Sequence, residues 1–251
     1  MEMNHDEIPD FFPSLSRRVI ELVSRAREAL FHLDVPLAMR LMAECSSVTA
    51  ESRKAEAACN ASLLVGISSA EERLHLVRCA QRCSRLGRVA HQVMQMMQNI
   101  QELDGQVTED EMVAFRPLFL LAEVELRDAV LSILRDDEQL AYGVRRKDEE
   151  LDSLYAAEMK RIFHHTSTAM FYNFQTGMSL LFILRAIERI GDHAAQLAVP
   201  SFYLLREGSG RRQEGCGVLR EGSGRLQEGS GAPQAQSHAS DEKRAANRVL
   251  L

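Results

Sequence analysis

The stretch LLFILRAIERIGDHAAQLA (residues 180–198) decides the fold, because its apolar residues recur at the spacing of an amphipathic helix. The apolar positions are Leu180, Leu181, Leu184, Ile187, Ala194 and Leu197. Glu188 and Asp192 are set into this pattern four positions apart, so both side chains lie on one side of the helix, roughly 6 Å from each other. Two like charges at that distance repel each other unless a cation lies between them.

The composition favours an all-α protein without a nucleic-acid partner. Of the 251 residues, 45% are hydrophobic and only 6% are aromatic. Leu, Ala, Met, Val and Ile carry the apolar content, and this mixture favours helices over strands. A net charge of -6 argues against nucleic-acid binding, which would show as a strongly basic domain.

The N-terminus and the cysteines indicate a cytoplasmic protein. The opening segment MEMNHDEIPD is acidic where a signal peptide is basic, and no apolar run is long enough to cross a bilayer, so we expect no membrane insertion. Five cysteines form no disulfide framework by number or spacing, which indicates reduced thiols in a reducing compartment.

Helical periodicity and capping signals predict six helices. Ser68 or Ser69 should cap the third helix, and Thr108 with Glu111 forms a capping box that opens the fourth. The start of the sixth helix is the hardest to place, at about His165 or Gly177. The first five helices are predicted at 14–33, 36–64, 69–100, 108–135 and 137–164. The sixth is predicted to end near residue 205.

The two halves of the chain repeat each other. Asp34 and Asp137 both follow an apolar helix and precede Leu-Ala, at an offset of 103. SRLGRVAHQV (84–93) matches ERIGDHAAQL (188–197) at an offset of 104. Two tandem three-helix bundles, residues 1–104 and 105–206, are the simplest architecture. The remainder, 207–251, repeats a Gly-rich seven-residue unit that cannot bury a core, so we expect a flexible tail.

A second acid pair, Asp148 and Asp152, repeats the four-residue spacing in the fifth predicted helix. If this helix packs antiparallel to the sixth, the four acids Asp148, Asp152, Glu188 and Asp192 face one another across roughly 8–10 Å between helix axes. Such an oxygen-only cage suits iron, manganese, magnesium or calcium better than zinc.

The alternative is that these acids are merely solvated or paired with nearby cations: Arg145, Lys147, Arg185 and Arg189. The first repeat offers no second cage, because its equivalent positions hold no acid: Cys45, Thr49, Ser84 and Arg88. We therefore expect one cage at most, with Arg88 reaching solvent or a carboxylate such as Glu44.

The phrases AIERIGDHAAQLA and KDEELDSLY resemble the motifs of the PhoU family of phosphate-signalling regulators. The resemblance covers about residues 14–206, and it is specific in the second half and weak in the first. It implies two three-helix bundles and carries over four metal ligands: Asp148, Asp152, Glu188 and Asp192. Iron or manganese is the first expectation for the metal, with magnesium or calcium as alternatives.

The same resemblance implies a function. A protein that looks like PhoU is expected to be a cytoplasmic homodimer that represses phosphate uptake and phosphate-starvation signalling. Its implied partners are the ATPase of the phosphate ABC transporter and a phosphate-sensing histidine kinase. Two other classes stay open: a metal-dependent carboxylate-cage enzyme, against which the absence of histidine ligands argues, and a metal-free helical adaptor.

Overall fold

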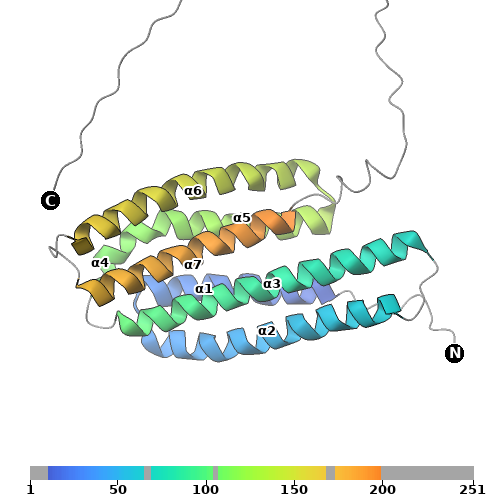
Figure 1. Ribbon diagram of the computed structural model, residues 1–251, viewed down its shortest axis with the longest axis horizontal. Helices are drawn as coiled ribbons and strands as arrows, with labels where there is room; N and C mark the ends of the chain where they lie inside the picture. The colour runs from blue at the N-terminus through green and yellow to red at the C-terminus, as the bar shows by residue number, and fades with distance from the viewer. Residues whose placement is uncertain (1–10, 65–68, 104–106, 168–172, 199–251) are drawn as a thin grey trace, which may run out of the picture. The chain divides into compact units, whose positions relative to one another are not determined.

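A computed structural model describes residues 11–64, 69–103, 107–167 and 173–198, and these ranges are helical with no strand. The predicted tail at 207–251 and the predicted boundary between bundles near 104 both lie outside the described residues. Six long helices run nearly parallel to one another (Figure 1). They are α1 (Phe11–Phe31), α2 (Val35–Leu64), α3 (Ala70–Glu102), α5 (Arg116–Arg135), α6 (Glu138–Ser167) and α7 (Phe174–Ala198).

The helices pack as two groups of three that share a core. α1, α2 and α3 pack against one another, and so do α5, α6 and α7. The groups meet where α3 packs on α7 and α1 packs on α5. Buried Leu, Ile, Val, Ala and Met side chains fill both groups and the seam between them. The expected all-α fold of two three-helix bundles is confirmed.

The turns that open α2 and α6 show the internal repeat in atomic detail. The Asp34 carboxylate accepts a hydrogen bond from the amide of Leu37 at 2.8 Å, and the Asp137 carboxylate accepts one from the amide of Leu140 at 3.0 Å. The residue before each Asp adopts a left-handed conformation, with φ of 48° at Leu33 and 52° at Asp136. The same cap on the same turn explains why these aspartates match at an offset of 103.

The predicted fourth helix is broken into three pieces, which corrects the single range expected from the sequence. The Thr108–Glu111 capping box forms as predicted, with the Thr108 amide donating to Glu111 at 2.7 Å. It opens only the short α4 (Glu109–Met112), which a 3₁₀ turn, η1 (Val113–Phe115), joins to α5. Pro117 explains the break, because it has no amide hydrogen to donate to the carbonyl of Val113.

The boundaries of the other helices differ from expectation by a few residues. Ser69, one of the two serines predicted to cap this helix, caps α3 by accepting a hydrogen bond from the amide of Glu72. α6 continues to Ser167, and α7 begins at Phe174, between the two predicted starts. The side-chain Oδ1 of Asn173 accepts a hydrogen bond from the amide of Thr176 at 2.8 Å, so an asparagine cap fixes this start.

None of the helices in the described ranges is both long enough and apolar enough to span a membrane.

Candidate functional site

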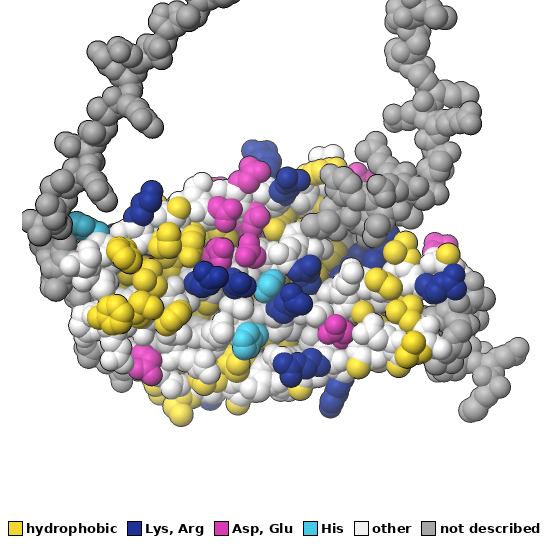
Figure 2. Space-filling model, viewed as in Figure 1, with side chains coloured by type: hydrophobic (Ala, Val, Ile, Leu, Met, Phe, Trp, Pro, Cys, Tyr) yellow, Lys and Arg dark blue, Asp and Glu magenta, His cyan; other side chains and the backbone are white. Residues whose placement is uncertain are grey.

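The two predicted acid pairs lie together on one face of the protein. α6 carries Asp148 and Asp152, and α7 carries Glu188 and Asp192. Asp152 is exposed and the other three side chains are half-buried. Burial raises the pKa of Asp148, and the charges of Asp152 and Asp192 raise it further. In Figure 2 acidic side chains gather near the middle of the face that α6 and α7 form.

Gly191 allows α7 to come this close to its neighbours. A Cβ atom at this position would lie 2.2 Å from Cδ2 of Leu151 on α6 and 2.9 Å from Oε2 of Glu125 on α5. Both distances are too short for a real side chain, so only glycine fits without displacement. The absent side chain therefore brings α5, α6 and α7 together beneath the acids.

Glu125 is a fifth acid of this cluster, and sequence reasoning missed it. Its side chain is completely buried, and neither carboxylate oxygen has a hydrogen-bond partner. A signal was present in the sequence, because Glu125 lies between Ala122 and Ala129 on the side of α5 that faces the core. An acid in a core register indicates either a buried ion pair or a functional group.

The environment of Glu125 favours its protonated form. Burial raises the pKa of Glu125 to about 8, and the neighbouring Asp148 charge raises it as well. Asp152 and Asp192 add smaller contributions in the same direction, and Lys147 opposes them. The pKa of Glu188 is raised by burial first and then by Asp192. The five carboxyl groups thus form one electrostatically coupled cluster.

The arginines and lysine near the cluster do not neutralise it by direct pairing. Lys147 pairs instead with Asp128 on α5, at 2.8 Å. Arg145 acts on Asp148, and Arg185 and Arg189 act on Glu188, only as more distant charges that lower the pKa. Among the residues that the structure describes, none of these three arginines forms an ion pair with the cluster.

The donor chemistry of the cluster fits a hard cation. All five groups offer carboxylate oxygens, and both oxygens of Glu125 and Oδ1 of Asp148 are buried without a hydrogen-bond partner. The side chains do not converge, however. Within the described ranges, no three Asp, Glu, His or Cys side chains are placed to hold a metal ion together. Ligation by Asp148, Asp152, Glu188 and Asp192 therefore stays a prediction.

Comparison with known proteins shows which family the segment that carries this cluster resembles. The family model described as "PhoU domain" matches residues 115–199, which contain α5, α6, α7 and all five acids. This match makes the second bundle similar to a PhoU domain. A phosphate-specific transport system accessory protein PhoU homolog from Xylella fastidiosa is 36% identical over 95 residues, which is 37% of this chain and 38% of the relative. A homolog of the same description from Rhizobium meliloti is 32% identical over 87 residues, which is 34% of this chain and 35% of that relative.

The fold resembles solved PhoU structures over a longer range. PhoU from Pseudomonas aeruginosa superposes with a TM-score of 0.70 at 20% identity, over 78% of this chain and 94% of that one. The phosphate transport system regulatory protein PhoU from Streptococcus pneumoniae superposes with a TM-score of 0.66 at 21% identity. This match covers 74% of this chain and 87% of that one. These likenesses extend the shared fold to the first bundle, whereas the sequence matches to the curated relatives span little more than a third of their length.

The first bundle has no acid at the positions that correspond to Asp148, Asp152, Glu188 and Asp192. Cys45 is buried, and burial raises the pKa of its thiol to about 12, so it is a neutral core side chain. Ser84 is half-buried, and Arg88 is exposed as expected. Glu44, the acid suggested as a partner for Arg88, pairs with Arg25 on α1 at 2.5 Å.

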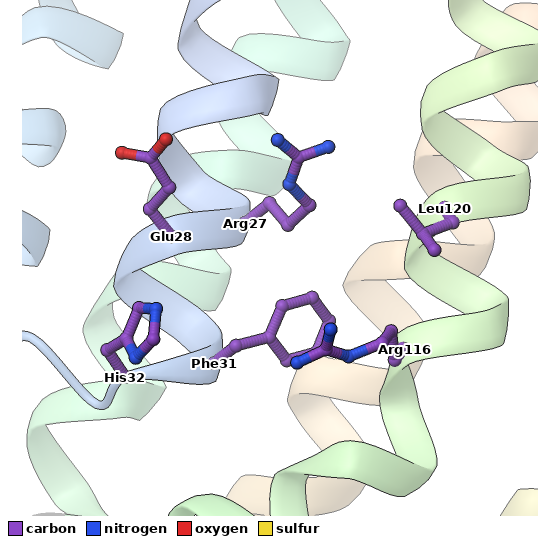
Figure 3. A pocket seen from close by; sticks show the side chains of 6 residues that line it. All are labelled: Arg27, Glu28, Phe31, His32, Arg116 and Leu120. Atoms are coloured by element: carbon purple, nitrogen blue, oxygen red, sulfur yellow. The ribbon is translucent and has the colours of Figure 1, made fainter.

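A pocket of about 310 Å³ lies where α1 of the first bundle meets α5 of the second bundle (Figure 3). Its floor is the ring of Phe31, and the Arg116 guanidinium lies 5.1 Å from the ring centroid. Arg27 on the pocket wall donates to the buried Glu123 at 2.7 Å. Because both arginines already have partners, we interpret the pocket as part of the contact between the bundles.

Proposed function

We propose that this protein is a cytoplasmic negative regulator of phosphate uptake and phosphate-starvation signalling, and that it acts by binding other proteins, not as an enzyme. The observation that carries the proposal is the match to the PhoU domain at 115–199, in which the acid cluster lies. The relatives from Xylella fastidiosa and Rhizobium meliloti are described as accessory proteins of a phosphate-specific transport system.

The partners in this proposal are the ATPase of the phosphate ABC transporter, a phosphate-sensing histidine kinase and a second copy of the chain. Support comes from exposed apolar side chains near the α6–α7 turn. Phe163, Phe174 and Phe182 expose 67%, 75% and 51% of their surfaces. Figure 2 shows apolar side chains gathered at that end of the molecule. Large exposed aromatic side chains of this kind mark protein contact surfaces.

The proposal includes a metal ion at the acid cluster, with iron or manganese as the first choice and magnesium or calcium as alternatives. A bound cation would supply positive charge to carboxylates that otherwise repel one another, and it would tie α6 to α7. Asp148, Asp152, Glu188 and Asp192 would hold it, with Glu125 beneath them. The unpartnered buried oxygens of Glu125 and Asp148 support this part of the proposal.

A metal-free helical adaptor is the second candidate. The observation that favours it is that no three potential ligand side chains converge in the described part of the chain. Metal analysis of protein purified without chelator and without a nickel column separates the two candidates. About one equivalent of iron or manganese in the wild type, lost in Asp192→Asn, supports the cage, and metal-free wild-type protein supports the adaptor.

Deletion of the gene in the source cell tests the regulatory function. Phosphate-starvation genes should become expressed in high phosphate, and reintroducing the wild-type chain should restore repression. The exposed Phe182→Ser variant should fold normally but fail to restore repression, whereas Tyr142→Ser, an exposed aromatic of α6 far from the α6–α7 turn, should restore it. Unchanged repression after deletion would rule out the proposed function.

A further inference from the structure

α3 carries no acid at the positions where α7 carries Glu188 and Asp192, and one of these positions is basic. The offset of 104 between the repeats places Ser84 opposite Glu188 and Arg88 opposite Asp192. Arg85 lies beside them on α3 and is half-buried, while Arg88 is exposed. At these two positions the first bundle therefore has one positive charge where the second bundle has two negative charges.

A pocket of about 380 Å³ opens beside these arginines, between α2 and α3. This volume lies within the range of about 300–1,000 Å³ that is typical of small-molecule sites. Polar groups line the pocket from both helices, and they are Glu56, Asn60, Gln81, Ser84, Arg85 and Arg88. The lining thus combines two guanidinium groups with amide and hydroxyl donors in one cavity.

The positive charge of this pocket is not balanced by pairing within the described part of the chain. Neither Arg85 nor Arg88 forms an ion pair or a side-chain hydrogen bond there, in contrast to Arg25 and Arg27 of α1, which each bind a glutamate. Burial lowers the pKa of Arg85, and the charge of Arg88 lowers it further. The two guanidinium groups therefore lie close enough to repel each other, and an anion between them would relieve that repulsion.

We propose that Arg85 and Arg88, together with Ser84 and Gln81, bind a small oxyanion of the phosphate type in the pocket between α2 and α3. A guanidinium group presents two parallel N–H donors that match two oxygens of a tetrahedral anion. The Ser84 hydroxyl and the Gln81 amide supply further donors from the same side of α3. Inorganic phosphate and the phosphate group of a small metabolite present the same chemistry to this site.

The negative charge of Glu56, on the α2 side of the pocket, allows a second test of whether the bound ion is an anion. Its carboxylate faces the same cavity as the two arginines, so it repels an anion bound there. Removing that charge should strengthen anion binding, whereas a site built to hold a cation would weaken. The pocket belongs to the first bundle, so the inference does not depend on the metal cluster or on the proposed regulatory function.

Equilibrium dialysis or titration calorimetry of the full chain with inorganic phosphate tests the site. Low ionic strength keeps the attraction unscreened, and a chelator removes metal ions that would themselves bind phosphate. We expect saturable binding at one site. Arg85→Gln and Arg88→Gln should each weaken it at least about tenfold, the loss of one charge-assisted hydrogen bond, and Glu56→Gln should tighten it.

Arg53→Gln is the matched control, because Arg53 is an exposed arginine of α2 that does not line the pocket. It should bind phosphate as the wild type does, and all variants should keep the wild-type helicity and melting temperature. A second titration with adenosine monophosphate separates the two sources of the anion: tighter binding than phosphate indicates a metabolite, and equal or weaker binding indicates the free ion. Absence of saturable phosphate binding, or equal binding by Arg88→Gln and the wild type, would overturn the proposal.

Discussion

Replacing Glu125 by Gln should stabilise the metal-free protein at neutral and alkaline pH. The pKa of Glu125 is about 8 in the folded protein against 4.5 for an ordinary glutamate, because the side chain is buried and Asp148 lies nearby. Between these two values the folded state binds more protons than the unfolded state, so stability falls as the pH rises. Above pH 8 the full cost of the buried charge is present. Gln keeps the shape of the side chain and never acquires that charge.

The pKa difference sets the size of the effect. At 1.36 kcal/mol for each pH unit, the shift from 4.5 to about 8 corresponds to an upper limit of about 5 kcal/mol. Relaxation of the neighbouring groups and entry of water reduce this figure, so we expect a gain of about 2 kcal/mol or more at pH 9. At pH 5 the folded wild type and Glu125→Gln should differ little, because Glu125 is then protonated.

The assay is urea unfolding of the full chain in the presence of chelator, at several pH values between 5 and 9. The difference in unfolding free energy between Glu125→Gln and the wild type should grow across this range and level off above about pH 8. Other titrating groups are common to both proteins, so the difference isolates the effect of Glu125.

Glu123→Gln is the matched control on the same helix. Glu123 is also buried, but it accepts hydrogen bonds from Arg27 and Arg127, each at 2.7 Å. Its replacement should destabilise the protein by about 1–3 kcal/mol at neutral pH, the opposite sign to Glu125→Gln. Parallel pH profiles for the wild type and Glu125→Gln would refute the reasoning, because Glu125 would then not be a buried acid that titrates near pH 8.

Two further predictions concern the acid cluster and the helix contact beneath it. Iron or manganese at several hundred times its dissociation constant should stabilise the wild type by roughly 3–4 kcal/mol, and thermal melts should show this gain lost in Asp192→Asn but kept in Arg88→Ala. Equal metal-induced shifts in the wild type and Asp192→Asn would contradict a metal site there. Gly191→Ala should cost about 1–3 kcal/mol in urea unfolding, because its Cβ would lie 2.2 Å from Leu151. Adding Leu151→Ala should recover part of that loss, and strictly additive losses would contradict the clash.

The sequence was enough to predict what depends on local spacing. Helical periodicity and capping residues located the helices other than the fourth to within a few residues, because a cap forms within one turn of its own chain. Ser69 and Thr108 accept hydrogen bonds from backbone amides as predicted, and Asp137 does the same. The repeat between Asp34 and Asp137 was also readable, because it reflects the same turn made twice. Pro117 was the missed local signal, and it breaks the predicted fourth helix.

Only the tertiary structure could decide what several helices place together. Asp148, Asp152, Glu188 and Asp192 were recognisable as two spaced pairs, but the sequence did not show that α5 adds the buried Glu125 beneath them. The pocket beside Arg85 likewise depends on α2 packing against α3. Spacing along one helix determines which side chains share a face, because the helix has a fixed period. Burial, charge coupling and cavities depend on contacts between residues far apart in the chain, and these are settled only when the helices pack.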